Sequence, residues 1–450
     1  MVHGKISRRR FMVQTGGAAV AAAAASNLAA PFVRTAHAAG SLNVGMWDHW
    51  VPGANASMEK QIRDWAEKEK VDVTVDFITS QGNKILLTAA AEAQAQAGHD
   101  VLYLQSWLTA RHNELLEPVD DIMTDLIKQN GDVSEVAKYL TRIKGVWRAV
   151  PNIYGAQMKG PASRIDLMKQ HAGIDVQAMY PAGAAPKSDN WTYDALLKAA
   201  EATHKAGVPI GIGLGATNDS IDSVGAIFAS FGGILVDEKG EIVVKSDGVR
   251  QALDYCRRIY PFLPPDSPSW DDSSNNKAYV AGKVSMILNP PSAWAVAVRD
   301  APKIAEQTWH HPMPKGPSGR YASFSQGAMG IWSFSKNKAA AKSLLRHLAS
   351  REAAEKMVEA SKGYDIPPYK NFKNFTTWAT IGPPKGTLYH YPDPHNDQIL
   401  AVAAMPSPHQ IGEQIYTQAL MPKMVVRHAQ GEDMEKTIAW AESEIEGFMR

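Results

Sequence analysis

Four consecutive residues, Trp47, Asp48, His49 and Trp50, place two indole rings beside two titratable side chains. An indole offers a flat apolar face, and Asp and His supply hydrogen-bond acceptors and donors. This mixture suits a binding surface. The alternative is that Trp47 and Trp50 are aromatic residues of a core or a lid, and the four residues alone do not decide between the two.

A strand is predicted before this cluster, because Leu42, Val44 and Met46 alternate with small or polar residues. After a Pro-Gly turn, apolar residues at helical spacing predict an amphipathic helix, and alternation over 71–78 predicts a second strand. In an open α/β sheet, ligands lie beyond the carboxyl ends of the strands. The cluster therefore falls where such a sheet binds its ligand.

Two further segments carry an indole next to polar side chains. A strand predicted over 100–104 leads directly to Ser106 and Trp107, again at a carboxyl end. A proline-rich loop over 261–270 delivers Trp270 and Asp271. We treat both segments as candidate binding residues.

The sequence favours binding over catalysis. Asp271 and Asp272 are adjacent and point apart on most backbones, whereas glycoside hydrolysis needs two carboxyl groups that face each other. His310 and His311 are adjacent in a turn-rich segment and lack the i, i+4 spacing of a zinc site. The lone Cys256 falls in an amphipathic helical pattern. We expect no catalytic residue, no metal and no cofactor.

The first 38 residues are predicted to be an export signal. Ser7 to Phe11 form a twin-arginine pattern, and an Ala-rich apolar run follows and ends at Ala38. Removing five basic residues and no acidic ones leaves 42 basic against 46 acidic residues, so the net charge changes from +1 to −4. This charge does not suggest a nucleic-acid partner. We expect a freely diffusing periplasmic protein exported by the Tat pathway, without a lipid anchor or an internal disulfide.

The remaining chain, about 410 residues long, exceeds what one hydrophobic core usually supports, which implies two lobes. Residues 145–150 and 153–158 resemble two short strands broken at Pro151. They are the candidate for a first crossing between the lobes.

Several segments, in their order along the chain, resemble one family. They are LNVGMWDHWVPGANASMEKQIRDWAEKE, DVLYLQ, GVWRAVPNIYG, GKVSMILNPPSAW, PMPKGPSGRYASFSQGAMGIWSFSKNKAAAKSLLRHLAS and SKGYDIP. This ordered set is similar to the extracellular solute-binding proteins that feed ABC importers, in particular the carbohydrate-binding group that includes maltose-binding proteins. The resemblance covers essentially all of residues 41–450.

The resemblance implies an α/β fold of the type II periplasmic-binding-protein kind. Each of its two lobes is a β-sheet flanked by helices, and crossover hinge segments join the lobes around a ligand cleft. We expect lobe 1 to comprise 39–150 plus 294–335 and lobe 2 to comprise 151–293 plus 336–450.

The resemblance also implies which residues face the cleft and touch the ligand. These are Trp47, Asp48, His49, Trp50, Gln81, Ser106, Trp107, Tyr154, Trp270, Asp271, Asn289, Gln326, Gly327, Tyr364 and Asp365. Such residue types suit a sugar, because aromatic rings stack on the C–H faces of pyranoses and polar side chains hydrogen-bond to hydroxyls.

The expected function is the capture of a small carbohydrate, either a mono- or oligosaccharide or a polyol, and its delivery to an ABC permease in the inner membrane. The expected state is a monomer. Two alternatives stay open. The same fold could bind a polyamine or quaternary amine in an aromatic box, or, more remotely, the chain could be a secreted carbohydrate-active enzyme. The double-Trp loop does not point to one named sugar.

Overall fold

The computed structural model describes residues 40–181, 184–380 and 397–450, so the predicted export signal lies outside the described residues. None of the helices in these ranges combines the length and apolar composition that a membrane crossing requires.

The first elements form the strand, loop, helix and strand unit predicted from the sequence. Strand β1 (Ser41–Trp47) leads through a turn to helix α2 (Ala54–Glu69) and strand β2 (Asp72–Ile78). Met58, Ile62 and Trp65 form the buried face of α2, as their helical spacing predicts. Strand β3 (Val101–Gln105) pairs in parallel with β1, and helix α3 (Lys84–Ala95) precedes it. The prediction for this part of the chain is confirmed.

A single mixed sheet runs in the order β2-β1-β3-β10-β6-β8-β7. Its two longest strands, β6 (Val150–Arg164) and β10 (Tyr321–Ile331), pair antiparallel. The shorter strands β8 (Met286–Asn289) and β9 (Thr308–His310) pair with β6, β7 (Ile210–Gly211) pairs with β8, and β11 (Ile399–Ala401) pairs with β10. A separate two-stranded sheet joins β4 (Arg142–Ile143) to β5 (Val146–Trp147).

The break predicted at Pro151 is wrong. Strand β6 continues through Pro151, which lies opposite Ala328 of β10. Pro151 is the second residue of the strand, where the loss of one backbone N–H interrupts little of the ladder. Residues on both sides of Pro151 therefore belong to one long strand.

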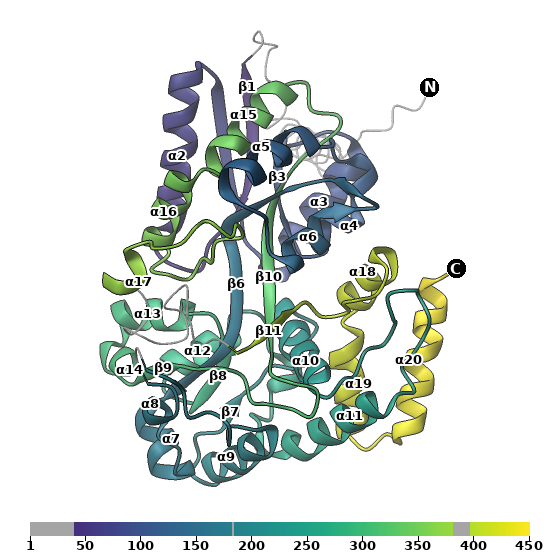
Figure 1. Cartoon of the computed structure of the whole chain (residues 1–450). Helices are drawn as coiled ribbons and strands as arrows, with labels where there is room; N and C mark the ends of the chain where they lie inside the picture. The colour runs from purple at the N-terminus through teal and green to yellow at the C-terminus, as the bar shows by residue number, and fades with distance from the viewer. Residues whose placement is uncertain (1–39, 182–183, 381–396) are drawn as a thin grey trace, which may run out of the picture. The chain divides into compact units, whose positions relative to one another are not determined.

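Helices surround the part of the sheet on either side of the paired strands β6 and β10 (Figure 1). The remaining α-helices are α4 (Leu108–Arg111), α5 (Asp120–Asn130), α6 (Glu135–Thr141), α7 (Ile165–Ala172), α8 (Val176–Met179), α9 (Tyr193–Lys205), α10 (Asn218–Ser230), α11 (Asp247–Ile259), α12 (Ser274–Val280), α13 (Ser292–Asp300), α14 (Pro302–Glu306), α15 (Lys338–Leu348), α16 (Arg351–Ala360), α17 (Thr377–Thr380), α18 (His409–Thr417), α19 (Leu420–Ala429) and α20 (Met434–Phe448). Short 3₁₀ turns occur at η1 (Gln81–Asn83), η2 (Asn113–Leu115), η3 (Tyr260–Phe262) and η4 (Ser267–Ser269).

The apolar side chains gather in two large cores. The first core contains side chains of β1, β3, α2, α5, α15 and α16. The second core contains side chains of α9, α10, α11, α19 and α20, and Trp107 and Ala110 also pack in it. A third, small cluster surrounds Trp270 and Tyr279. Figure 1 shows β6 and β10 side by side, running between the elements of the first core and those of the second.

The pairing of β6 with β10 is irregular at two glycines. Its register shifts between Ser325 and Gly327, and Gly155 of β6 has a φ of 76°, in the left-handed region that favours glycine. A side chain at Gly327 would collide with the Tyr154 carbonyl oxygen and lie 2.9 Å from Cε2 of Tyr103. Both glycines let the two strands approach closely where they pass between the cores.

We predict that Gly327→Ala lowers the free energy of unfolding by about 2 kcal/mol or more, because backbone and ring atoms occupy the space of the new methyl group. Urea denaturation measures this quantity. The matched control is Gly447→Ala near the end of α20, where no atom lies within 4 Å of the added carbon. Alanine has the higher helix propensity, so the control should be neutral or slightly stabilising. Equal effects of the two substitutions would contradict the prediction.

Candidate functional site

A cleft lies between two groups of segments. One group follows the strands β2 and β3, and the other comprises the start of α10 and helix α18. On one side it is lined by Ser80, Asn83, Ile85, Leu86, Gln105, Ser106, Trp107 and Leu108, from the β2–α3 connection and from the end of β3 into α4. On the other side it is lined by Ala216, Asn218 and Ile221, around the start of α10, and by Tyr416 and Thr417 of α18. The space between the lining atoms is about 590 Å³, part of it open to solvent. We call this space the cleft.

Polar contacts in the cleft come from both sides. The Asn218 side-chain amide donates a hydrogen bond to Oε1 of Gln105 across the cleft, with an N···O distance of 3.1 Å. The Ser106 and Tyr416 side chains are only 3% and 4% exposed and interact with each other, and the Tyr416 hydroxyl also interacts with the Asp222 carboxylate. A hydroxyl has one donor and two acceptor sites, so both hydroxyls can still bond to a ligand.

Two residues of the cleft have an unusual backbone conformation. Asn83 has a φ of 57° and Ser106 a φ of 46°. Asn tolerates the left-handed region, but Ser rarely adopts it. The Ser106 backbone N–H donates to the Gln326 carbonyl oxygen at 3.1 Å, which holds this conformation. Such local strain is typical of functional sites, where the surrounding structure enforces it.

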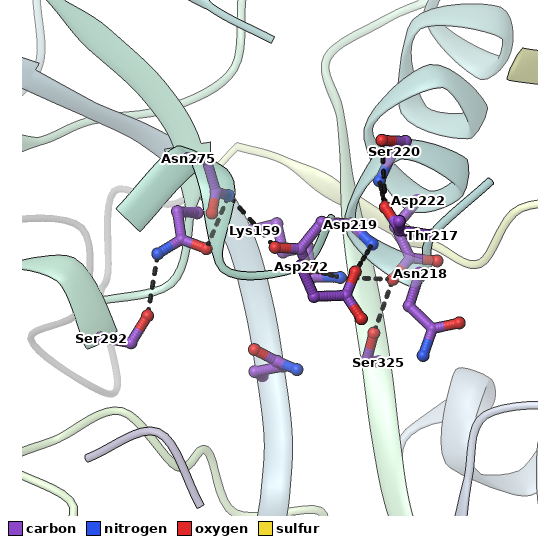
Figure 2. Close-up of polar contacts among 12 residues, drawn as sticks. Lys159, Thr217, Asn218, Asp219, Ser220, Asp222, Asp272, Asn275, Ser292 and Ser325 are labelled. Atoms are coloured by element: carbon purple, nitrogen blue, oxygen red, sulfur yellow. Dashed lines mark hydrogen bonds and ion pairs between the residues drawn. The ribbon is translucent and has the colours of Figure 1, made fainter. Parts of the chain in front are cut away.

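A group of charged residues lies beside the cleft at the first turn of α10. We call Lys159, Asp219, Asp222, Asp272 and Ser325 the Lys159 cluster (Figure 2). Lys159 Nζ lies 2.8 Å from Asp219 Oδ1 and 2.7 Å from Asp222 Oδ2. The Ser325 hydroxyl donates to the same Asp222 oxygen at 2.7 Å, and the Asp219 backbone N–H donates to Asp272 Oδ1 at 3.2 Å. One ammonium group thus faces three carboxyl groups.

Among the described residues, Lys159 is the cation that contacts the carboxyl groups of this cluster. Burial and then the Asp219 carboxylate raise the pKa of Asp272 to about 7, although Lys159 opposes the shift. Asp222 is fully buried, and its carboxylate also interacts with the Tyr416 hydroxyl. Burial, followed by the charge of Asp222, raises the pKa of Tyr416 well above its usual value. The Asp222 carboxylate therefore lies next to the Tyr416 ring that lines the cleft.

A chain of amides continues from the Lys159 cluster toward α13. Asn275 Nδ2 donates to Asp219 Oδ2 at 3.1 Å and to Asn289 Oδ1 at 3.3 Å, and Asn289 Nδ2 donates to Ser292 Oγ at 2.8 Å (Figure 2). These amides pack against one another, so their hydrogen bonds orient Asp219.

A second buried group surrounds Asp365, and we call it the Asp365 cluster. It contains Trp47, His49, Tyr103, Tyr154, Tyr364 and Asp365, with ring centroids 4.6 to 6.4 Å apart. The Gly155 backbone N–H donates to Asp365 Oδ1 at 2.8 Å, and His49 Nε2 lies 3.2 Å from the same oxygen. The Val51 N–H donates to His49 Nδ1, so the imidazole proton is on Nε2 and is donated to Asp365. These contacts hold the loop after β1 and the segment at Asp365 against Gly155 of β6.

The predicted site residues fall into distinct places. Ser106 and Trp107 line the cleft, and Gln81 lies exposed between Ser80 and Asn83, which also line it. Trp47, His49, Tyr154, Tyr364 and Asp365 meet in the Asp365 cluster and are buried there. Gln326 and Gly327 are buried at the strand crossing, where the Gln326 side-chain amide donates to the Asn152 carbonyl oxygen at 2.9 Å. Asp48 is exposed and Trp50 half-buried.

The other three predicted residues lie beyond α10. Asn289 belongs to the amide chain described above. Trp270 is buried against Gly211 and Gly213, and Asp271 is exposed and accepts from the Ser273 N–H and the Ser273 and Ser274 hydroxyls. Both line a second, small cavity with Asp219 and Asn275.

Trp107 has packing contacts inside the protein as well as a place in the cleft wall. Its Nε1 donates to the Ala403 carbonyl oxygen at 3.2 Å, and its ring lies edge-on to Tyr139 at 5.6 Å. A side chain at Gly412 would collide with this ring. Trp107 thus holds α18 in place and still forms part of the cleft wall.

Sequence reasoning missed Asn83, Gln105 and Asn218 at the cleft, and the Lys159 cluster beside it. One available signal was the run from Thr217 to Asp222, in which a helix N-cap is followed by two carboxylates three residues apart. Lys159 and Gln105 had no such signal, because each lies inside a strand pattern.

The raised pKa of Asp272 predicts a pH-dependent stability. Between about pH 4 and pH 7 the folded protein binds more protons at this carboxyl than the unfolded chain, so the free energy of unfolding falls as the pH rises. Asp272→Asn removes this contribution. The stability of the variant relative to the wild type should therefore increase by about 1–3 kcal/mol from pH 4 to pH 8.

Urea denaturation at a series of pH values checks this. Asp254→Asn, which changes an exposed carboxylate of α11, is the control and should show no such trend. A pH-independent difference between Asp272→Asn and the wild type would show that Asp272 titrates normally in the folded protein.

Comparisons with known proteins agree with this architecture. The chain resembles several solved structures along most of its length. One is T. maritima MalE3 with maltose bound, with 18% identity, a TM-score of 0.71 and coverage of 91% of this chain and 99% of that one. A second is a sugar transporter protein of Arthrobacter chlorophenolicus A6 with bound laminaribiose, with 14% identity, a TM-score of 0.71 and coverage of 91% and 99%.

A third is a solute-binding protein of Agrobacterium vitis S4 with bound D-mannitol, with 19% identity, a TM-score of 0.67 and coverage of 91% and 98%. These likenesses establish the α/β periplasmic-binding-protein fold that the sequence resemblance implied.

A probable ABC transporter-binding protein of Deinococcus radiodurans is 27% identical over 151 residues, which are 33% of this chain and 35% of that protein, so the match spans about a third of this relative. A model of the bacterial extracellular solute-binding protein family matches residues 61–381, which is more than half of the chain. The chain belongs to the bacterial extracellular solute-binding protein family.

Proposed function

We propose that this protein captures a small carbohydrate, a mono- or oligosaccharide or a polyol, in the cleft and delivers it to the permease of an ABC importer. The observation that carries the proposal is the uncharged polar lining of the cleft, contributed from both of its sides. Binding and release are the whole activity, and no bond is made or broken.

The lining suits hydroxylated solutes. Asn83, Gln105 and Asn218 have amides that both donate and accept, and the Ser106 and Tyr416 hydroxyls have unused hydrogen-bonding capacity. A polyhydroxylated ligand presents the same mixture of donors and acceptors. The structural neighbours named above were solved with maltose, laminaribiose and D-mannitol, which supports this class of ligand.

Ligand capture requires contacts from both sides of the cleft. A ligand shifts an equilibrium between open and closed forms only through contacts that differ between them. The Gln105–Asn218 hydrogen bond joins the two sides without a ligand, and a sugar hydroxyl would insert between or beside these amides. We propose that Gly155 and Gly327 in the β6–β10 pair form the hinge for this movement.

The predicted lobe boundaries change at two places. We propose that α15 and α16 belong to lobe 1, because Leu344, Leu345 and Met357 pack in the first core with the N-terminal strands. We propose that β9 and the start of β10 belong to lobe 2, because Trp309, Met313 and Phe324 pack in the second core. Lobe 1 is then 39–150 plus about 326–375, and the rest of the chain after 150 forms lobe 2.

The predicted ligand contacts divide accordingly. We propose direct contact for Ser106, Trp107 and Gln81, at the cleft, and for Trp270, Asp271 and Asn289, beside the Lys159 cluster. We also propose ligand contact for Asp48 and Trp50, on the loop after β1. For Trp47, His49, Tyr154, Gln326, Gly327, Tyr364 and Asp365, we propose a supporting role at the strand crossing.

A carbohydrate suits the site better than an amine held in an aromatic box. The box would need Trp47, Trp50, Trp107, Trp270 and Tyr364 around one space. Trp107 packs in the second core, Trp270 in the third cluster, and the others in or against the first core. We therefore favour hydrogen bonding to hydroxyls over cation–π binding by these five rings.

A ligand screen tests the proposal. Sugars, polyols, amines and amino acids are added separately, and a ligand that binds only the folded state raises the melting temperature. We expect the shifts among sugars and polyols. For the best ligand, Gln105→Ala and Asn218→Ala should each raise Kd about tenfold in calorimetry, the effect of one lost hydrogen bond.

The control is Gln251→Ala, which removes an exposed amide of α11 at a groove outside the cleft. Its Kd should match the wild type. Shifts with amines alone, or an equal loss of affinity in the control, would refute the proposed ligand class or the proposed site.

We also propose a periplasmic monomer exported through the twin-arginine pathway. Replacing Arg8 and Arg9 together with Lys keeps the charge but removes the twin-arginine pair. Cell fractionation should then find the protein in the cytoplasm, whereas Arg34→Lys should leave it in the periplasm. Periplasmic protein in the Arg8/Arg9 double variant would point to another export route.

A further inference from the structure

Three hydroxyl groups line one part of the cleft. Ser106 follows β3, and Tyr416 and Thr417 are the last two residues of α18. A hydroxyl carries one proton and two lone pairs, so its contacts inside the protein decide whether it can still donate to a ligand. The acceptors next to these three residues fix the direction in which each proton points.

The Tyr416 proton is directed to Asp222. Lys159 Nζ and the Ser325 hydroxyl both lie 2.7 Å from Asp222 Oδ2, and the Asp222 side chain is fully buried (Figure 2). A carboxylate that is paired with an ammonium group is ionised and can only accept hydrogen bonds. In the contact between the Tyr416 hydroxyl and Asp222, the tyrosine is therefore the donor.

The Ser106 proton is directed to Tyr416. The two hydroxyls interact with each other, and both residues are buried. Because the single proton of the phenol is donated to Asp222, the phenol oxygen accepts in this contact and Ser106 donates. Protons are thus donated in series from Ser106 to Tyr416 and from Tyr416 to Asp222, and such hydrogen bonds polarise one another. What Ser106 Oγ still offers to a ligand is its lone pairs.

Thr417 donates its proton within α18. Its hydroxyl donates to the Glu413 carbonyl oxygen at 2.9 Å and lies 3.3 Å from Glu413 Oε1. Arg111 Nη1 donates to the same carboxylate oxygen at 3.1 Å, which holds the Glu413 side chain in place. These contacts are separate from those of Tyr416 and have the same consequence, because the Thr417 oxygen also offers only lone pairs to the cleft.

We propose that Ser106, Tyr416 and Thr417 form an acceptor-only wall, at which the cleft selects a solute by the hydroxyl protons that the solute presents. The inference rests on the proposed carbohydrate-binding function. A free hydroxyl of a sugar or polyol donates to the wall, whereas a fluoro, keto, O-methyl or O-acyl group in the same place brings acceptor atoms against acceptor atoms. The wall therefore favours unmodified sugars and polyols over forms that are oxidised or substituted at the hydroxyls facing it.

Deoxy and deoxyfluoro sugars test the wall without a change to the protein. The parent is whichever of glucose, galactose, mannose, maltose, laminaribiose and mannitol binds most tightly in calorimetry, and each of its hydroxyls is replaced in turn by hydrogen or by fluorine. Fluorine accepts weakly but has no proton. Where a hydroxyl faces the wall, both replacements should weaken binding about tenfold or more, and the fluoro form should bind no more tightly than the deoxy form.

Two variants locate the wall at these residues. Thr417→Val and Tyr416→Phe each remove one acceptor oxygen with little change in volume, and each should weaken binding of the parent about tenfold. Affinity for the deoxy form that lacks the facing hydroxyl should stay within about twofold of the wild type, since the contact is already absent from it. The matched control is Thr124→Val on α5, because Thr124 is exposed and its hydroxyl likewise donates to a carbonyl oxygen four residues earlier, at 2.8 Å. Its affinity for every sugar should equal that of the wild type.

The outcomes separate this inference from the proposed function. If the parent binds and the fluoro form binds more tightly than the deoxy form at every position, the acceptor-only wall is refuted and the carbohydrate-binding function stands. The same conclusion follows if Thr417→Val and Tyr416→Phe bind the parent as the wild type does, or weaken the parent and all its deoxy forms equally. If none of the parents binds, the proposed function fails and the wall fails with it.

Discussion

The antiparallel pairing of β6 with β10 is the interaction on which the rest of the structure depends. Strand β10 pairs with β3 at one end and with β6 along its length, while β6 continues to β8 and β9. The two strands therefore carry hydrogen bonds for the elements of both cores. Gly155 and Gly327 allow the close approach that this continuity requires, since a side chain at Gly327 would meet the Tyr154 carbonyl oxygen. The position of the cleft follows from this crossing.

Two buried carboxylates join segments that are far apart in the sequence. Oδ1 of Asp365 accepts from the Gly155 N–H and the His49 imidazole. Asp222 shares Lys159 with Asp219, accepts from the Ser325 hydroxyl and interacts with the Tyr416 hydroxyl. Buried charges repay their desolvation only when good geometry and further hydrogen bonds accompany them. Both carboxylates have such directed partners.

The Trp47 to Trp50 loop illustrates the limits of reasoning from residue types. Its position after a strand was predicted from alternation, and β1 indeed ends at Trp47. Whether an indole there faces a ligand or a core depends on what packs over it. Tyr103 and Tyr154, from strands far along the chain, enclose Trp47, which is 2% exposed. The residues near Trp47 in the sequence do not indicate that these two tyrosines pack against it.

The sequence by itself determined the classes of structure and protein: a strand, loop, helix and strand beginning, an α/β fold and membership of a solute-binding family. These depend on periodicity and on an ordered set of segments, which are local properties of the chain. Only the tertiary structure decided that Gln105 meets Asn218 and that Lys159 meets Asp219 and Asp222. Each of these contacts joins residues more than 50 positions apart, and their proximity follows from the β6–β10 crossing that no local pattern encodes.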